Sequence, residues 1–393
     1  MKKLIAVILS SLILCSMAAC SSSGKTEKTS SQASTVSAVQ SDVSDKSSDT
    51  SKTEISKEDT SKTESSKEES SKEEISVDAN AQAILEEVTK RYDFNGVAYI
   101  EKDGKPYAYY VAGKLDNGDP IKLDTPMPIG SVSKQFCAAA ILYLRDQGKL
   151  SVDDTLGKYF PEYEDGKDIT LKNLLLMRSG ILTFTEDVWK GTSTDKTYEE
   201  NTEWIKNWIF TQPLVFEQGK KFDYSNSNFF LLGEIVEKVS GKKYIDFLRE
   251  AFFEPLGMKN TGSVEEMAAS AEWAKGVMHN NVDLQPALTK GAGNLVTTAS
   301  DLTLWLNSLT SGKAISAESY KEMTTSPNSR DGYGYGIKVN FAKGIGHAGI
   351  IGKYTAIDYI NTDKNLTITL MSSNLSAGDI QSVFSETVLP LIE

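Results

Sequence analysis

Cysteine and histidine are scarce in this chain of 393 residues, which holds three of the first and two of the second. Two of the cysteines, Cys15 and Cys20, lie at the very beginning of the chain, so Cys137 has no partner for a disulfide framework. His279 and His347 stand apart, without a cysteine pair, so the ligand spacing of a zinc site is missing. We therefore expect chemistry that needs neither a metal nor another cofactor.

Clustered positive charge is also missing. Lys and Arg total 42 against 54 Asp and Glu, which gives a net charge of −12 and an isoelectric point near 4.9. Because phosphate backbones are bound by clusters of Lys and Arg, nucleic acid is not an expected partner. The Gly-x-Ser-x-Gly turn of Ser-His-Asp hydrolases is absent as well. With 39% hydrophobic residues, the chain can still form a sizeable core.

Residues 1–19 have the pattern of an export signal. Lys2 and Lys3 precede the apolar run Leu4 to Leu14, which is too short to span a membrane. The ending Met17-Ala18-Ala19-Cys20 resembles a bacterial lipobox, which implies cleavage before Cys20 and a lipid on its sulfur. The alternative is an ordinary secretory signal with a chance cysteine. We expect an exported protein, anchored by lipid to the extracytoplasmic face of the cell membrane.

Residues 20–77 are predicted to be a disordered tether. They are rich in Ser, Lys and Glu, and a five-residue repeat begins with Ser51-Lys52-Thr53-Glu54. Without aromatic residues the segment cannot bury a core, and as a flexible coil it would span about 40 Å. The folded domain is therefore expected to occupy residues 78–393.

The folded part is predicted to be an α+β domain, an α/β sandwich in which both chain ends contribute to one antiparallel sheet. The turn Asp103-Gly104 joins two strand-like runs, and further runs of this kind occur near the end of the chain. The region between them is mostly helical. A first helix is expected near 84–92 and a closing helix at 379–391. The sheet is expected from two regions: about 94–125, with strands at 96–100 and 107–111, and about 332–376, with strands at 334–341, 354–360 and 366–371. The helical insertion is expected at about 131–325.

Ser131 and Lys134 stand at the entrance of a predicted buried helix. The run Phe136 to Leu144 is uncharged and apolar all round, and Gly148 ends it. Three residues apart on a helix, Ser131 and Lys134 share one face. Burial and the helix dipole both favour the neutral amine, and a neutral amine beside a hydroxyl can activate a serine nucleophile. The same Ser-x-x-Lys spacing recurs at Ser22 to Lys25 and Ser240 to Lys243, so the motif alone does not decide.

Two further polar stretches are candidates for the same site. Phe222-Asp223-Tyr224-Ser225-Asn226 precedes a helix predicted at 229–239; alternatively, Ser225 or Asn226 only caps that helix and Tyr224 only packs. Gly346-His347-Ala348-Gly349-Ile350 lies between two predicted strands and could admit a substrate, or could be a bare turn. The spacing Gly344-x-Gly346-x-x-Gly349 matches a dinucleotide fingerprint, but no helix is predicted after it.

In this order, Ser131-x-x-Lys134, Tyr224-x-Asn226 and His347-x-Gly349 resemble the motifs of the serine β-lactamase and penicillin-binding-protein family. Within it, the chain is similar to the class C β-lactamase-like branch, which includes D-alanyl-D-alanine carboxypeptidases, D-amino-acid peptidases and esterases. The resemblance covers nearly all of residues 78–393. Further segments that carry it are 169–175 with Ser179-Gly180, 231–235, and 291–295 leading to Asp301-Leu302.

The resemblance implies a role for each motif residue: Ser131 as nucleophile, Lys134 as its proton acceptor, Tyr224 as the hydroxyl that passes protons to the leaving group, Asn226 as the group that orients Lys134 and the substrate, His347 and Gly349 as substrate-binding residues, and the amides of Ser131 and Ile350 as the oxyanion hole. His347 takes the place of the lysine in the family's Lys-Thr-Gly strand. The chain departs from the family at Met177-Arg178, Gly293-Asn294 and Ile350.

We therefore expect an exported, lipid-anchored serine hydrolase that acts through an acyl-serine on an amide or ester at the cell envelope. The substrate stays open between a peptide ending in D-alanine, a β-lactam and a small ester. The alternative is a non-catalytic lipoprotein that keeps the fold to bind wall peptides. An unperturbed histidine titrates near pH 6.5, so His347 is expected to offer a substrate carboxylate a hydrogen bond but little charge. Uncharged substrates should then be favoured, unless His347 merely packs beside the glycines.

Overall fold

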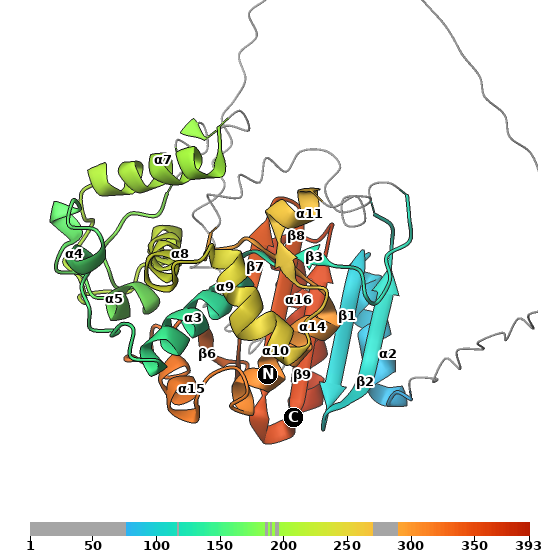
Figure 1. Cartoon of the computed structure of the whole chain (residues 1–393). Coiled ribbons are helices and arrows are strands. Elements are labelled where there is room, and N and C mark those ends of the chain that lie inside the picture. Colours follow the sequence, from blue (N-terminus) through green and yellow to red (C-terminus); the bar gives the residue numbers. More distant parts are fainter. Residues whose placement is uncertain (1–75, 116–117, 185–187, 189–190, 193–195, 270–289) are drawn as a thin grey trace, which may run out of the picture. The chain divides into compact units, whose positions relative to one another are not determined.

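The computed structural model describes residues 76–115, 118–184, 188, 191–192, 196–269 and 290–393 (Figure 1). The expected export signal, Cys20 and all but the last residues of the tether lie outside these ranges. His279 also lies outside them. Within the described ranges, no helix has both the length and the apolar character that a membrane span requires.

Both ends of the chain build one antiparallel sheet of six strands, as predicted. The order is β2-β1-β9-β8-β7-β6, so the cyan strands from the beginning of the domain stand beside the red strands from its end (Figure 1). The strands are β1 Gly96–Lys102, β2 Lys105–Ala112, β6 Lys338–Phe341, β7 Gly344–Ile351, β8 Tyr354–Asn361 and β9 Leu366–Ser372.

The predicted hairpin turn joins β1 to β2. Asp103 and Gly104 take positive φ angles of 53° and 72°, which Asp tolerates and Gly adopts freely. Every residue of β8 is buried, because β8 is a central strand covered on both faces.

Two terminal helices cover one face of the sheet. These are α2 Ala79–Arg91, capped by the Asp78 carboxylate, and α16 Ala377–Ile392. Their buried side chains pack with those of β1, β8 and β9 in one cluster, in which Phe384 stacks on Phe341 with ring centroids 4.7 Å apart. Helices α2 and α16 therefore cover one face of the sheet, and the helical region covers the opposite face.

The helical region packs on the other face through α14 Ala299–Thr310, while α3 Lys134–Asp146 packs against α14 and α8 Asn226–Ser240 packs against α3. Phe136 of α3 stacks on Trp305 of α14 with centroids 3.9 Å apart. The remaining helices and turns of this region are η1 Gly130–Ser133, α4 Leu156–Tyr159, η2 Glu164–Gly166, α5 Leu171–Leu175, α7 Tyr198–Thr211, α9 Tyr244–Leu248, η3 Arg249–Phe253, α10 Glu254–Leu256, α11 Val264–Ala269 and α15 Ala317–Met323.

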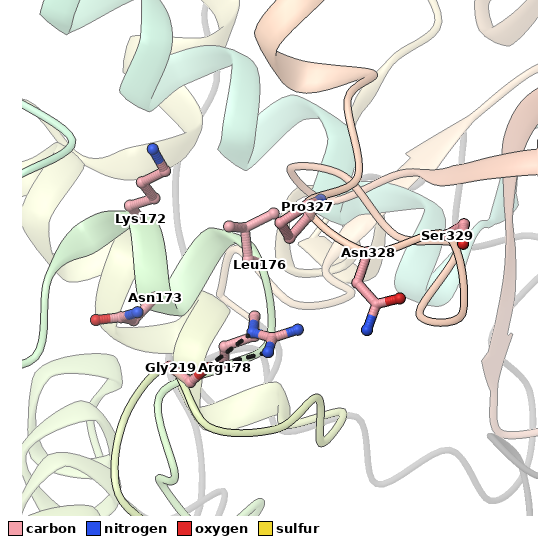
Figure 2. A pocket seen from close by; sticks show the side chains of 8 residues that line it. All are labelled: Lys172, Asn173, Leu176, Arg178, Gly219, Pro327, Asn328 and Ser329. Carbon is pink, nitrogen blue, oxygen red and sulfur yellow. Dashed lines mark hydrogen bonds between the residues drawn. The ribbon is translucent and has the colours of Figure 1, made fainter.

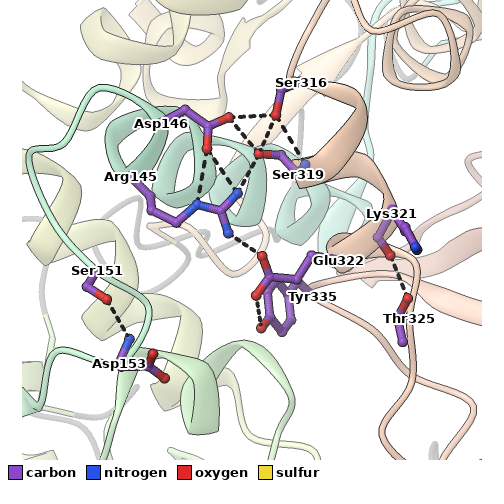
Figure 3. A network of polar contacts seen from close by, with 10 residues as sticks. All are labelled: Arg145, Asp146, Ser151, Asp153, Ser316, Ser319, Lys321, Glu322, Thr325 and Tyr335. Atoms are coloured by element: carbon purple, nitrogen blue, oxygen red, sulfur yellow. Dashed lines mark hydrogen bonds and ion pairs between the residues drawn. The ribbon is translucent and has the colours of Figure 1, made fainter.

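The far end of α3 is fixed by a polar network (Figure 3). Arg145 forms ion pairs with Asp146 and with Glu322 of α15, and it donates a hydrogen bond to Ser319 at 2.6 Å. Tyr335 donates to Glu322 at 2.8 Å. Because α3 also begins at the Ser131 turn, this network holds the other end of the helix that carries the candidate base.

The structure corrects several predicted boundaries. The stretch 346–350 lies inside strand β7 and is not a turn, and the strand predicted at 334–341 is reduced to β6, Lys338–Phe341. Helix α8 begins at Asn226, three residues earlier than predicted. A small second sheet, β3 Met127–Pro128, β5 Leu295–Thr297 and β4 Gly262–Ser263, was not predicted, because strands of two or three residues give no periodic signal.

Candidate active site

Ser131 lies in the short 3₁₀ turn η1, immediately before α3. Gly130 in this turn has a φ of 50°, and a Cβ added there would come 2.7 Å from both the N and the O of Ile350. Likewise, a Cβ on Gly349 would come 1.9 Å from Ile129 O and 2.9 Å from Ser131 N. The turn and strand β7 therefore lie backbone against backbone, and both contact positions require glycine.

Lys134 is the first residue of α3 and is completely buried. Its Nζ lies 3.0 Å from Ser131 Oγ, 2.8 Å from Asn226 Oδ1 and 2.6 Å from the carbonyl oxygen of Ala292. None of these partners is a carboxylate, so hydrogen bonds alone oppose the loss of hydration of the ammonium form. Burial accordingly lowers the pKa of Lys134 from 10.5 to about 7.

The three partners of Nζ suit both forms of the amine. The amide oxygen of Asn226 and the carbonyl oxygen of Ala292 can only accept, so each takes one N–H hydrogen of Lys134. The ammonium form donates its third hydrogen to Ser131 Oγ, and once that proton is lost the electron pair of Nζ can face the Ser131 hydroxyl. Ser131 and Lys134 thus lie together as predicted, in the geometry that general-base activation of a serine needs.

Tyr224 and Asn226 complete the group from the start of α8. The centroid of the Tyr224 ring lies 5.0 Å from Lys134 Nζ. Burial raises the pKa of Tyr224 well above 10, so its hydroxyl stays protonated at neutral pH. The alternative in which Ser225 caps the helix is wrong, since Ser225 stands at the cap position but its side chain makes no capping hydrogen bond.

His347 lies beside this group, but its ring is not free to donate a hydrogen bond to a substrate. Its ring is 2% exposed, with Nδ1 2.6 Å from Ala348 O and Nε2 3.1 Å from the Tyr333 hydroxyl. Because the carbonyl can only accept, Nδ1 carries the hydrogen and Nε2 accepts from Tyr333. Burial, helped by Lys338 and Lys134, lowers the pKa of His347 well below 6.5. The neutral ring has no N–H left for a substrate carboxylate, so the expected hydrogen bond does not fit this geometry.

Ile350 follows on the same strand with a 45% exposed side chain. Its backbone N lies against Gly130, next to the amide of Ser131. β8 pairs with one edge of β7 here, but on the other edge β6 pairs only from Gly344 to Gly346, so η1 lies against that edge beyond Gly346. The two amides predicted to form an oxyanion hole are therefore brought to the same place.

Two partners of the site were not predicted from the sequence. The Ala292 carbonyl carries no side-chain signal, although the segment around it was noted for the resemblance. Tyr333 was missed because nothing local marks it; its ring contacts those of both Tyr224 and His347, with centroids 6.1 and 5.7 Å away. Both partners come from segments distant in sequence, so only the fold reveals them.

Arg178, one of the departures from the family pattern, connects the segments that contain Gly219 and Asp331. It donates from Nε and Nη2 to Gly219 O at 3.3 and 3.0 Å (Figure 2). It also forms an ion pair with Asp331. Its neighbour Met177 accepts at its carbonyl from the N–H of Asp223, next to Tyr224. A cavity of about 670 Å³ opens here, lined by Lys172, Asn173, Leu176, Arg178, Gly219, Pro327, Asn328 and Ser329.

The model of the family described as "Beta-lactamase" matches residues 81–381, which is most of the chain. The chain belongs to the beta-lactamase family. As a beta-lactamase-family chain, it has its Ser-x-x-Lys, Tyr-x-Asn and His-x-Gly motifs inside the matched range.

Curated relatives of this beta-lactamase-family chain are bacterial. It is 31% identical over 272 residues to a protein of Bacillus subtilis (strain 168) described as a penicillin-binding protein, PbpX, covering 67% of the chain and 66% of that protein. It is 25% identical to the D-aminopeptidase of Brucella anthropi, covering 77% and 60%. It is 27% identical to the teichoic acid D-alanine hydrolase of Staphylococcus aureus, covering 53% and 52%. The chain thus spans about half to two thirds of these relatives' length.

Solved structures show the same fold. The D-amino acid amidase of Ochrobactrum anthropi SV3 in complex with L-phenylalanine amide matches with a TM-score of 0.66 at 22% identity, covering 80% of this chain and 97% of that one. A penicillin-binding protein from Bacillus halodurans matches with a TM-score of 0.64 at 21% identity, covering 77% and 99%. The predicted α+β fold is therefore confirmed.

Proposed function

We propose that this protein is a serine hydrolase that forms an acyl-enzyme on Ser131 and acts on amides or esters of D-amino acids. The observation that carries the proposal is the setting of Lys134: it is buried without a carboxylate partner, two acceptors take two of its hydrogens, and Nζ lies 3.0 Å from Ser131 Oγ, so the neutral amine can accept the Ser131 proton. A lysine with a pKa of about 7 is poised to act as a base near neutral pH.

The reaction follows from these positions. Ser131 Oγ attacks the substrate carbonyl carbon while its proton passes to Lys134 Nζ. The N–H groups of Ser131 and Ile350 donate to the resulting oxyanion. The bond to the leaving group then breaks as the proton returns through the Tyr224 hydroxyl, which leaves an ester on Ser131. Water attacks that ester by the same proton path and releases the acid.

The substrate class is inferred from the relatives and from position 347. The D-aminopeptidase, the teichoic acid D-alanine hydrolase and the D-amino acid amidase all carry a D-amino acid in their names. His347 is neutral and both its ring nitrogens are bonded, so this strand position offers no cation to a carboxylate. We therefore favour uncharged amides and esters over β-lactams and peptides with a free carboxylate beside the scissile bond.

The proposed location is the outer face of the cell membrane. It rests on the export signal pattern of residues 1–19, on Cys20 as the lipid-bearing residue, and on the polar tether that follows. Substrates at the cell envelope, such as wall peptides or polymer-linked D-alanine esters, would then be within its reach.

The alternative of a non-catalytic binding protein is less well supported. A binding protein would have no need of a buried lysine without a carboxylate partner, because such a lysine destabilises the fold. Ser131, Lys134, Tyr224 and Asn226 are all present and in contact.

The test is covalent labelling of the full chain by an activated fluorophosphonate, read by intact mass. Wild-type protein should gain one label and Ser131→Ala none. A D-alanyl ester should be hydrolysed by the wild type and not by Ser131→Ala. Ser225→Ala is the matched control, because the Ser225 hydroxyl is buried nearby and has no hydrogen-bond partner among the described residues. Equal labelling of wild type and Ser131→Ala would reject the assignment.

A further inference from the structure

A second fully buried ionisable group lies directly behind the site. Asp358 is on β8, paired with His347 of β7, and is 0% exposed. Its Oδ1 accepts from the backbone N–H of His347 at 2.6 Å and from Gln135 Nε2 at 2.9 Å. Its Oδ2 accepts from the same Gln135 nitrogen at 2.7 Å. The proposed reaction uses neither Asp358 nor Gln135.

These hydrogen bonds come from neutral donors, so the carboxylate is buried without a compensating charge. Burial raises the pKa of Asp358 from 3.8 to about 7. A carboxyl group in such a position destabilises the fold when it ionises. Asparagine, of nearly the same size, would avoid that penalty, but its NH₂ group would then face the NH₂ group of Gln135. The position therefore needs a group that only accepts.

The network continues through Gln135 into the helical layer. Gln135 Oε1 accepts from Trp305 Nε1 of α14 at 3.2 Å, which fixes the direction of the Gln135 amide. Gln135 directly follows Lys134 on α3, and His347 lies three residues before Ile350 on β7. Asp358 thus links the helix that carries the base to the strand that carries one oxyanion donor.

We infer that Asp358 is a positioning residue, which holds the amide of Ile350 at the distance from Ser131 that the oxyanion requires. The inference rests on the proposed function. Its physical basis is that the two donors lie on different elements, and a misplacement of about 1 Å can lower a rate by about 100-fold. The contacts at Gly130 and Gly349 stop the two elements from approaching further, and the Asp358 to Gln135 link stops them from separating.

The experiment exchanges the carboxylate of Asp358 and the amide of Gln135, using variants of the full chain. Asp358→Asn places an NH₂ group against that of Gln135, and kcat for a D-alanyl ester should fall about 10- to 100-fold with KM nearly unchanged. In the double variant Asp358→Asn/Gln135→Glu, the new carboxylate accepts from both the asparagine NH₂ and Trp305, while the asparagine oxygen keeps the His347 N–H. Its kcat should return to within about threefold of wild type.

The control is Thr303→Val, which removes a buried hydrogen bond of 3.1 Å between Thr303 of α14 and Thr369 of β9, away from β7. It should lower the melting temperature and leave kcat unchanged. Wild-type kcat in folded Asp358→Asn would overturn the inference. If that variant does not fold, the double variant decides: restored kcat supports the link, and a folded double variant with kcat more than about tenfold down overturns it. Wild-type protein that the fluorophosphonate does not label would instead overturn the proposed function.

Discussion

The rate at which Ser131 is acylated should follow the ionisation of a lysine with a pKa of about 7. Only the neutral amine can take the serine proton, and its fraction is one half at the pKa and falls about tenfold for each pH unit below it. Between pH 8 and pH 5 the second-order rate constant should therefore fall about 90-fold, and above pH 8 it should be nearly constant. A solvent-exposed lysine would instead give a rate that still rises between pH 8 and pH 10.

The assay is the rate of labelling by an uncharged fluorophosphonate, measured by intact mass at fixed times, so that no ionisation of the probe enters the profile. Asp358→Asn is the necessary control, because the pKa of Asp358 is also raised to about 7. The acid limb should persist in this variant, at a lower overall rate, if Lys134 is its source. His347 should contribute little at and above pH 6.5, since burial holds its pKa well below that value. A profile without a plateau above pH 8, or one that Asp358→Asn abolishes, would refute the reasoning.

Three further changes test other parts of the site. Gly349→Ala would place a Cβ 2.9 Å from Ser131 N, so turnover should fall at least about 100-fold, whereas Gly378→Ala, with 3.8 Å to its nearest neighbour, should be neutral in the same ester assay. His347→Lys should raise β-lactam acylation relative to ester hydrolysis, because it adds an amine that can carry positive charge; an unchanged ratio of specificity constants would argue against a charge effect at this position. Cys20→Ala should release the protein from membranes or leave it unprocessed, and wild-type protein found free and without lipid would contradict the anchor.

Local signals in the sequence were sufficient for the proximity of Ser131 and Lys134 and for most strands of the large sheet. Ser131 and Lys134 are one helical turn apart before an uncharged run, so their proximity follows from chain geometry alone. Strands β8 and β9 and the helix α16 were predicted within a few residues, because each is a long apolar segment bounded by turns.

Contacts between residues distant in sequence determine the features that local patterns did not predict. The ring of His347 is neutral and fully bonded because Tyr333 and the Ala348 carbonyl meet its two nitrogens, and a local pattern does not reveal such partners. The role of Gln135 depends on Asp358, which lies 223 residues further along the chain. The strand character of the His347 segment was obscured because three glycines between 344 and 349 look like a turn, although all three admit close backbone contacts.

The two buried groups behind and within the site also set how the stability of the whole domain responds to pH. The pKa of Lys134 is lowered from 10.5 to about 7, so the unfolded chain binds the extra proton between these values and stability rises with pH across that interval. The pKa of Asp358 is raised from 3.8 to about 7, so its stabilising contribution is present at low pH and is lost as pH rises towards 7. Each contribution is on the order of 4 kcal/mol. The sum of these two contributions is least favourable near neutrality, where half of the Lys134 side chains are neutral. The lowered pKa of His347 opposes the contribution of Asp358 below pH 6.5, because the unfolded chain binds the extra histidine proton there.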